Sequence, residues 1–387
     1  MGQANQYSHI IEYIKSLFPG QDFIPLHEPR FTGNEKKYVT DAIDSTFVSS
    51  VGAYVNRFEE MMQDITGAKY AVATVNGTSA LHMALIVAGV KQGDEVLSQD
   101  LTFIATANAI SYIGAHPVFL DIDRKTLGLS ADKLEAFLQE HGQKRETGTI
   151  NKRTGRRIAA CVPMHTYGLP CEIDKIAAIC KEWQISLVED AAESLGSYYK
   201  GRHTGGFGLL GTFSFNGNKT VTCGGGGAIV TDNEQLAKLA KHLTTQAKVP
   251  HAWEFNHDHV GYNYRMPNLN AALACAQLEQ LNTFVDNKRD LAEKYKNFFS
   301  EVKEVRFCEE GKDARANYWL NALLLENRAA RDAFLEEANS NGVMSRPAWT
   351  LMHKLPMFRN CQHDDVTESE LVADRLVNVP SSVRIER

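Results

Sequence analysis

Short apolar runs alternate with longer stretches of helical periodicity along the first two thirds of the chain. The apolar runs predict strands over residues 71–75, 95–98, 117–122, 158–164, 185–190, 211–217 and 227–232. Between the first two strands, apolar residues recur every three or four positions from Leu81 to Ala88, as on one face of a helix. Strands that alternate with helices are typical of a mostly parallel sheet with helices on both faces. The pattern therefore predicts an α/β fold.

The pattern changes in the last third of the chain. A strongly helical stretch over residues 267–300 leads to a predicted strand within 316–326 and then to another helix. We expect a large α/β domain over residues 1–250, which includes an N-terminal helical segment. A smaller α+β domain is expected over residues 251–387.

Composition limits the classes of partner. The 387 residues carry a formal net charge of −6, so no overall basic field favours nucleic acid or an anionic membrane. The charged segment 141–157 is interpreted as an exposed loop or hairpin between sheet elements. No apolar run approaches the roughly 20 residues of a membrane span, and the N-terminus lacks the basic start and apolar stretch of a leader. We expect a cytoplasmic protein.

Seven cysteines are spread singly along the chain, without a Cys-x-x-Cys pair. This spacing favours reduced, mostly buried thiols over zinc ligands, which usually come in closely spaced pairs. We therefore expect no metal site.

Four features of the sequence carry candidate chemistry. Lys219 follows an apolar run and precedes four consecutive glycines, which would leave space for a ligand. Asp190 ends a predicted strand, at the edge of an open α/β sheet where ligands gather. Gly77 and Thr78 lie where the first strand turns into a helix, and Phe103 follows the second strand. A surface lysine, a surface acid, a simple helix cap and a core phenylalanine are the plain alternatives.

Together the four features match what pyridoxal 5′-phosphate (PLP) requires from a protein. A lysine forms a Schiff base with the cofactor, an acid keeps the pyridine nitrogen protonated, and an aromatic side chain lies against the ring. Free N–H groups at the start of a helix bind the phosphate. The sequence offers one candidate for each requirement and therefore predicts a PLP enzyme.

Six motifs between residues 76 and 273 resemble the DegT/StrS family of nucleotide-sugar aminotransferases, and the resemblance runs over nearly the whole chain. They are NGTSALH, LTFIATA, MHTYG, VEDAAES, FSFNGNK and GYNYRMPNLNAAL. The resemblance implies a fold-type I PLP enzyme, with a large, mostly parallel sheet domain and a smaller α+β C-terminal domain. It also implies that Lys219 forms the Schiff base and carries the proton, that Asp190 pairs with the pyridine nitrogen, and that Phe103 stacks on the ring.

Further expectations come from the resemblance alone. Ser214 would hold the phosphate together with Gly77 and Thr78. His165 matches a position near the cofactor, with a structural histidine as the alternative. Asn263 would reach the phosphate from a neighbouring subunit, which implies a homodimer with shared active sites.

Glu193 departs from the family pattern. Many members have glutamine at this position, where its side chain reaches the ring oxygen of the cofactor. A carboxylate beside that phenolate is unfavourable unless it is protonated or turned away. The role of Glu193 is therefore open. Related sugar dehydratases carry histidine in place of the lysine, so Lys219 favours transamination over dehydration.

The resemblance also suggests the substrates. L-Glutamate would convert the cofactor to pyridoxamine 5′-phosphate and leave as 2-oxoglutarate, and the amine would then pass to a nucleotide-linked keto sugar. The stretch SRPAWTLMHKLPMF (residues 345–358) resembles the branch that aminates UDP-linked 4-keto-6-deoxy-N-acetyl sugars, on routes to bacillosamine and legionaminic acid for surface glycans. The expected substrate is UDP-2-acetamido-2,6-dideoxy-4-keto-hexose, and the product is of the UDP-N-acetylbacillosamine type. Arg346 and His353 are candidates to meet a diphosphate or a carboxylate, with a surface arginine and a packed histidine as the alternatives.

Three other functions stay open. A PLP-dependent sugar dehydratase or lyase would use the same cofactor site without taking an amino group from glutamate. An aminotransferase for a 3-keto sugar linked to dTDP or GDP is the second alternative. A nicotinamide-dependent sugar dehydrogenase would fit the α/β pattern, but the chain lacks a Gly-x-Gly-x-x-Gly turn between the first strand and helix of a βαβ unit.

Overall fold

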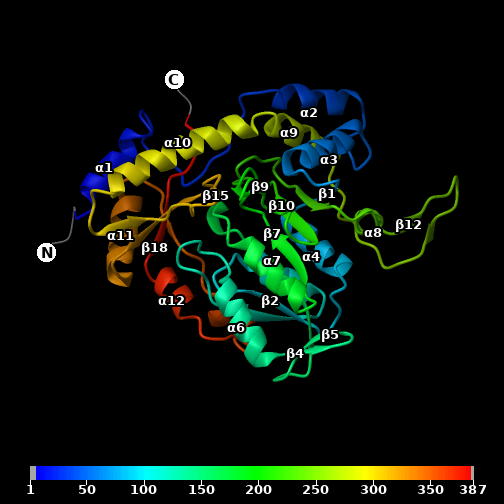
Figure 1. The fold of residues 1–387 in the computed structure, drawn as a ribbon. Helices are drawn as coiled ribbons and strands as arrows, with labels where there is room; N and C mark the ends of the chain where they lie inside the picture. The colour runs from blue at the N-terminus through cyan, green and yellow to red at the C-terminus, as the bar shows by residue number, and fades with distance from the viewer. Residues whose placement is uncertain (1–5, 385–387) are drawn as a thin grey trace.

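A nine-stranded sheet spans the larger part of the computed structural model, which describes residues 6–384 (Figure 1). Its main path runs β1-β11-β10-β7-β6-β2-β3. These strands are β1 (Tyr70–Thr74), β2 (Glu95–Gln99), β3 (His116–Leu120), β6 (Arg157–Val162), β7 (Ser186–Asp190), β10 (Leu210–Ser214) and β11 (Gly227–Thr231). Neighbours from β10 to β3 are parallel, whereas β11 runs antiparallel between β1 and β10. The predicted α/β fold with a mostly parallel sheet is confirmed.

The charged segment 141–157 forms a hairpin at this sheet. Its strands are β4 (Gly142–Arg145) and β5 (Gly148–Asn151), and β5 pairs with β6. The interpretation of the segment as a hairpin between sheet elements is therefore confirmed.

Alternate residues of the strands face opposite helical layers, as the period of a strand requires. Val72 packs with α4 (Gly77–Val87), α5 (Ile104–Tyr112) and α8 (Glu234–Thr244). Its neighbours Ala71 and Ala73 pack on the other face, against α3 (Ala53–Thr66) and α9 (Asn268–Leu278). Further along that face lie α6 (Ala131–His141) and α7 (Ile173–Glu182). Because α4 is buried along almost its whole length, its N-terminus has a fixed position at the end of β1.

A second, antiparallel sheet forms the core of a smaller unit. Its strands, in the order β14-β16-β18-β17, are β14 (Val305–Phe307), β16 (Asn321–Leu325), β18 (Leu376–Val379) and β17 (Arg346–Pro347). Three helices accompany it: α10 (Leu281–Phe299), α11 (Arg328–Ser340) and α12 (Thr367–Ala373). This unit is the predicted α+β part of the fold.

The N-terminal helix packs against this smaller unit. Ile10 and Ile14 of α1 (Ser8–Ser16) belong to the same hydrophobic cluster as Leu291 and Tyr295 of α10, and α1 lies along α10 in Figure 1. The boundary expected between residues 250 and 251 stays a prediction. We propose that the N-terminal helix be grouped with the smaller unit, because its apolar face is buried there.

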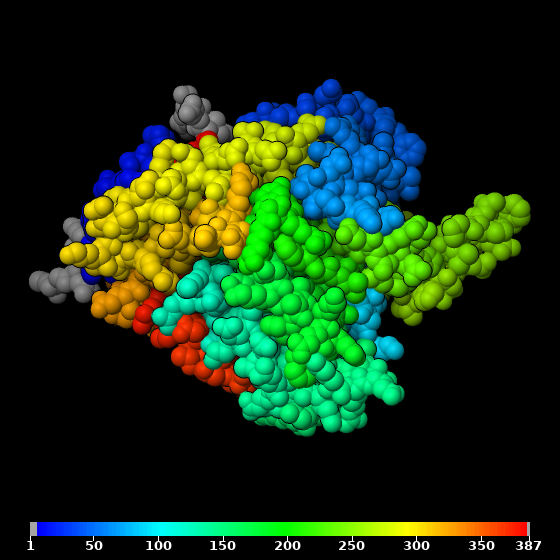
Figure 2. Space-filling model, viewed as in Figure 1, coloured from blue at the N-terminus to red at the C-terminus, as the bar shows by residue number. Residues whose placement is uncertain are grey.

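The remaining elements are short or peripheral. They are α2 (Glu35–Asp44), β8 (Tyr198–Tyr199), β9 (Arg202–His203), β15 (Ala314–Arg315), η1 (Thr166–Gly168) and η2 (Met352–Lys354). A hairpin of β12 (Lys248–Val249) and β13 (Asn256–His257) projects from the body as an arm (Figure 2). Across residues 6–384, no helix combines the length and the apolar composition that crossing a bilayer requires.

Candidate active site

The carboxyl ends of the central strands open into a cavity of about 350 Å³. Seven of the side chains singled out from the sequence line it: Gly77, Thr78, Phe103, Asp190, Glu193, Ser214 and Lys219. Residues that the sequence did not single out complete the wall: Asn76, Leu81, Ala105, Met164, Ala192, Asn216, Asn218, Trp319 and Trp349. The edge of an open α/β sheet is where such a site is expected. A larger hollow of about 1010 Å³ lies between the N-terminal segment and α10, away from these residues.

Asp190 presents a buried carboxylate to the cavity from the end of β7. One carboxylate oxygen accepts a hydrogen bond from the Thr106 hydroxyl at 2.7 Å, and the other accepts from the Ala192 N–H at 3.2 Å. Burial raises the pKa of Asp190, and the hydrogen bonds from Thr106 and Ala192 and the charge of Lys219 oppose that rise. No lysine, arginine or histidine within residues 6–384 forms an ion pair with Asp190. A protonated pyridine nitrogen would supply the missing cation.

His165 lies behind Asp190 and does not line the cavity. Its ring is completely buried, with Nε2 at 3.1 Å from Glu189 Oε2. Because the Cys171 N–H donates to Nδ1, the imidazole proton is placed on Nε2, where it can be donated to Glu189. Glu189 also accepts N–H groups from residues 205, 207 and 208. His165 therefore contacts Glu189 of β7 inside the protein, and its side chain does not reach the cavity.

Lys219 and Glu193 face each other across the cavity floor. Lys219 Nζ lies 3.4 Å from Glu193 Oε1 and 4.0 Å from the centre of the Trp319 indole ring. The other oxygen of Glu193 accepts the Tyr167 N–H at 2.8 Å. Burial raises the pKa of Glu193 to about 7, although the Lys219 charge and the Tyr167 N–H act in the opposite direction. A protonated Glu193 is therefore accessible near neutral pH, and in that form it would not repel a phenolate.

Trp319 reaches the site because the chain before β16 does not form a regular strand. The Trp319 indole N–H donates to the Asn218 carbonyl at 2.6 Å. The Asn317 side chain donates to the carbonyls of Glu193 and Leu195 at 2.9 and 2.8 Å. The strand predicted within 316–326 is confirmed as β16, Asn321–Leu325, whereas residues 316–320 are irregular. Apolar periodicity could not indicate this, because the irregular stretch is held by side-chain hydrogen bonds.

The N-terminus of α4 forms the opposite end of the cavity. Asn76 caps the helix by accepting the Ser79 N–H at 2.7 Å. The N–H groups of Gly77 and Thr78, in the first turn of α4, have no acceptor in the described part of the chain. A Cβ on Gly77 would lie 2.7 Å from the Cβ of Ser214, so only glycine allows the two segments to approach so closely. Two free N–H groups with nearby hydroxyls at a helix start fit a phosphate.

Phe103 and Trp349 form an aromatic wall. Phe103 precedes α5 and is 46% exposed, which is unusual for a phenylalanine that serves only the core. Its ring meets Trp349 edge-to-face, with 6.0 Å between centroids, and Trp349 lies 4.9 Å from the Tyr167 ring. An exposed ring of this kind can lie against a flat cofactor. The side chains around the cavity therefore fit PLP: a lysine, an unpaired buried acid, an aromatic face and a phosphate cradle.

Besides His165, three residues expected at the site lie outside the cavity in this chain. Asn263 is exposed beside the end of α8. Arg346 on β17 is exposed and donates to the Asn339 side chain and to the Ser345 carbonyl. His353 is packed against Asp100, with Nδ1 2.6 Å from its carboxylate. The expectation that Arg346 and His353 meet the substrate is not supported by these positions, because each side chain already has partners within the chain.

Replacement of Glu193 by glutamine should make the free energy of unfolding of the cofactor-free protein less dependent on pH. In the unfolded chain this carboxyl ionises near 4.5, whereas burial keeps it protonated up to about 7 in the folded protein. Wild type should therefore lose stability relative to Glu193→Gln as the pH rises from about 4.5 to about 7, by up to ~3 kcal/mol, with a constant difference above that range.

Urea unfolding at about pH 5 and about pH 8 measures this difference. The matched control is Glu135→Gln on the exposed face of α6, which should show no such trend. A stability difference between wild type and Glu193→Gln that is the same at both pH values would contradict the raised pKa.

Comparison with known proteins agrees with this geometry. Residues 29–387 match the DegT/DnrJ/EryC1/StrS aminotransferase family. The GDP-perosamine synthase of Escherichia coli O157:H7 is 36% identical over 359 residues, which cover 93% of each chain. That of Vibrio cholerae is 36% identical over 361 residues, which cover 92% of this chain and 94% of the relative. The crystal structure of the aminotransferase TlmJ from Streptoalloteichus hindustanus is similar with a TM-score of 0.84, at 26% identity, and the match covers 93% of both chains.

The comparisons and the cavity lead to the same assignment. The family match covers nearly all of the chain, and the matches to the two GDP-perosamine synthases, each 36% identical, cover more than nine tenths of those relatives. The chain belongs to the DegT/DnrJ/EryC1/StrS aminotransferase family and is a PLP-dependent sugar aminotransferase.

Proposed function

We propose that this enzyme moves the amino group of L-glutamate to a keto sugar carried by a nucleotide, with 2-oxoglutarate as the second product. The observation that carries the proposal is the convergence of Lys219, Asp190 and the start of α4 on one cavity. They come from three different segments, the loop after β10, the end of β7 and the start of α4, and match the reactive, pyridine and phosphate ends of one cofactor.

The roles of the side chains follow from their positions. When bound, PLP supplies the electron sink for the carbon that gains or loses the amino group. The Asp190 carboxylate, which forms no ion pair with any described residue, would hold the proton on the pyridine nitrogen. Lys219 Nζ, once free, moves the proton in both half-reactions. Trp319, at 4.0 Å from Nζ, limits the access of water to that atom.

We propose that two copies of the chain share their active sites. Asn263 lies outside the cavity of its own chain, which supports a contact with the phosphate of a neighbouring subunit. The projecting arm carries Trp253 and Phe255, which are 78% and 79% exposed, and Val260, on the segment that returns from it, is 84% exposed. Apolar side chains on a projecting hairpin are typical of a surface that another molecule covers.

For the sugar, two candidates have support. The UDP-linked 4-keto-6-deoxy-N-acetyl sugar remains our first choice, because the stretch 345–358 that resembles that branch contributes Trp349 to the cavity wall. A GDP-linked keto sugar is the second candidate, because the two relatives at 36% identity are GDP-perosamine synthases.

We also propose that the enzyme works in the cytoplasm. All seven cysteines are unpaired and six of them are buried. Unpaired thiols are typical of proteins in a reducing compartment.

A panel of keto sugars tests the substrate. The PLP-loaded enzyme is incubated with L-glutamate and with UDP-, GDP- or dTDP-linked 4-keto-6-deoxy sugars, and the amino product and 2-oxoglutarate are followed by mass spectrometry. We expect kcat/KM for the UDP-linked N-acetyl sugar to exceed the others by at least about tenfold, since one lost polar contact in a specific pocket has that effect. A preference for the GDP sugar would replace the first choice by the second, and amination of none would contradict the proposed function.

Shared active sites can be tested by mixing two variants. Lys219→Ala and Asn263→Ala are co-expressed with different affinity tags, and each is also purified alone. If Asn263 serves the partner's cofactor, a mixed dimer has one site with both residues intact, so random mixing should restore about a quarter of wild-type activity. A mixture no more active than its two components would show that Asn263 acts within its own chain or not at all.

A further inference from the structure

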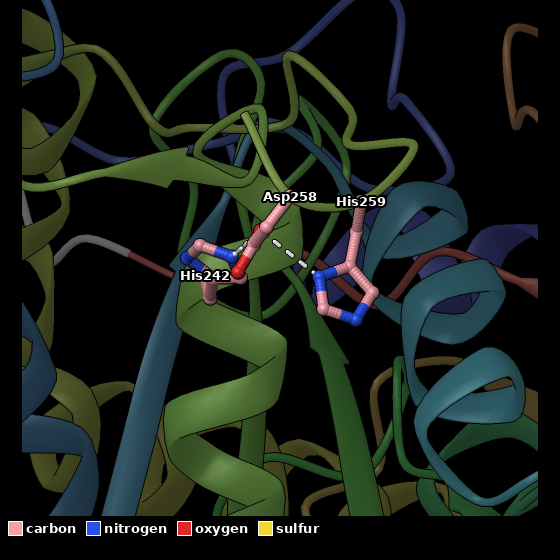
Figure 3. A group of neighbouring side chains, drawn as sticks. All are labelled: His242, Asp258 and His259. Carbon is pink, nitrogen blue, oxygen red and sulfur yellow. Dashed lines mark hydrogen bonds and ion pairs between the residues drawn. The ribbon is translucent and has the colours of Figure 1, made fainter. Parts of the chain in front are cut away.

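The base of the projecting arm holds a group of three side chains that metal ions commonly bind. His242 lies in the last turn of α8, and Asp258 and His259 lie where the chain returns from the arm (Figure 3). The three side chains point toward one another across the junction between helix and returning segment. None of them takes part in the cavity described above.

The backbone brings the two segments together without help from these side chains. The Tyr262 N–H donates to the Leu243 carbonyl at 2.7 Å. Gly261 lies so close to the turn after α8 that a Cβ would be 2.2 Å from the carbonyl carbon of Gln246, so this approach requires glycine. The arrangement of the three side chains therefore rests on a fixed scaffold, as a binding site needs.

The donor atoms form a compact set. One Asp258 oxygen lies 2.6 Å from His242 Nε2 and 2.9 Å from His259 Nδ1. One ligand atom from each of the three residues lies within 4.8 Å of the other two. Ligands at the zinc distances of about 2.0–2.1 Å stand roughly 3.3 Å apart in a tetrahedron, so Asp258 would have to move away from each histidine nitrogen by less than about 1 Å. In the single chain the side chains are between a quarter and three fifths exposed, so solvent reaches the three residues there.

From this geometry we propose that His242, Asp258 and His259 bind one divalent transition metal ion, of the class of Zn²⁺ or Ni²⁺, with water completing the coordination. Two imidazole nitrogens with one carboxylate oxygen favour this class over Mg²⁺ and Ca²⁺, which prefer sets of oxygen ligands. The ion would also neutralise the negative charge of Asp258, which forms no ion pair with a lysine or arginine of the described residues. A bound ion would fasten the base of the arm to α8.

Two further histidines of the same segment are turned away. The His257 Nδ1 atom lies 2.8 Å from the Gln246 carbonyl, and His251 Nδ1 accepts the Glu254 N–H at 3.0 Å in the outer part of the arm. Neither belongs to the set of ligand atoms that lie close together. They therefore provide matched controls that remove a histidine from the arm and leave the proposed site intact.

The test is a titration of the tag-free, PLP-loaded enzyme with Zn²⁺ after treatment with a chelator, followed by calorimetry. Wild type should bind about one Zn²⁺ per chain at this site. His242→Ala and His259→Ala should each lower the affinity for Zn²⁺ by at least about tenfold. Loss of a residue that only supports a metal ligand already lowers metal affinity by about tenfold or more. His251→Ala should bind as wild type does.

The second readout is the visible absorption of added Co²⁺, whose intensity reports its coordination by the protein. His259→Ala is the decisive variant, because this exposed side chain can be removed without disturbing α8. The proposal is overturned if wild type binds no more Zn²⁺ than a His242→Ala/His259→Ala double variant, or if His251→Ala loses the ion as readily as His259→Ala. A Co²⁺ spectrum that is the same in wild type and in the double variant would overturn it as well.

Discussion

Three buried carboxyl groups at the end of one strand are the constraint around which this active site is built. Glu189, Asp190 and Glu193 are 0%, 5% and 3% exposed. A buried carboxylate without partners is costly by several kcal/mol. Each group has a different set of partners. Glu189 accepts three backbone N–H groups and faces His165. Asp190 accepts only two hydrogen bonds, so its negative charge stays available to the cavity. Glu193 accepts a hydrogen bond from the ammonium group of Lys219.

Two residues in the left-handed region of backbone space hold these partners in place. Tyr167 has φ of 56° and directs its N–H to Glu193. Tyr318 has φ of 49° and lies between Asn317, which binds the Glu193 carbonyl, and Trp319, which faces Lys219. Bulky residues adopt this conformation at a cost and only where the surroundings enforce it. Strain on both sides of Glu193 is therefore part of how the fold positions the lysine and its neighbour.

The sequence predicted the sheet and seven of the residues that line the cavity, because both depend on local signals. Apolar runs mark strands, and Asp190 and the turn at Gly77 follow directly from strand ends. Trp319 and Trp349 could not be predicted in this way, since they come from the smaller unit and meet the cavity only through tertiary packing. The contact of His353 with Asp100 could not be predicted for the same reason, because Asp100 is 253 residues away in the sequence. The proposed metal site was not predicted, because the hairpin of the arm separates His242 from Asp258 and His259 in the sequence, so the three residues form no short motif.

The assignment depends on a covalent bond between Lys219 and PLP at this cavity. The most direct measurement is the visible absorbance of the purified, PLP-loaded protein before and after addition of L-glutamate, with Lys219→Ala treated in parallel. The structure predicts a visible band in wild type that glutamate bleaches, and no such band in Lys219→Ala. A band of equal strength in the variant, or a wild-type protein that cannot be loaded with PLP, would contradict the role of Lys219 and with it the active site described here.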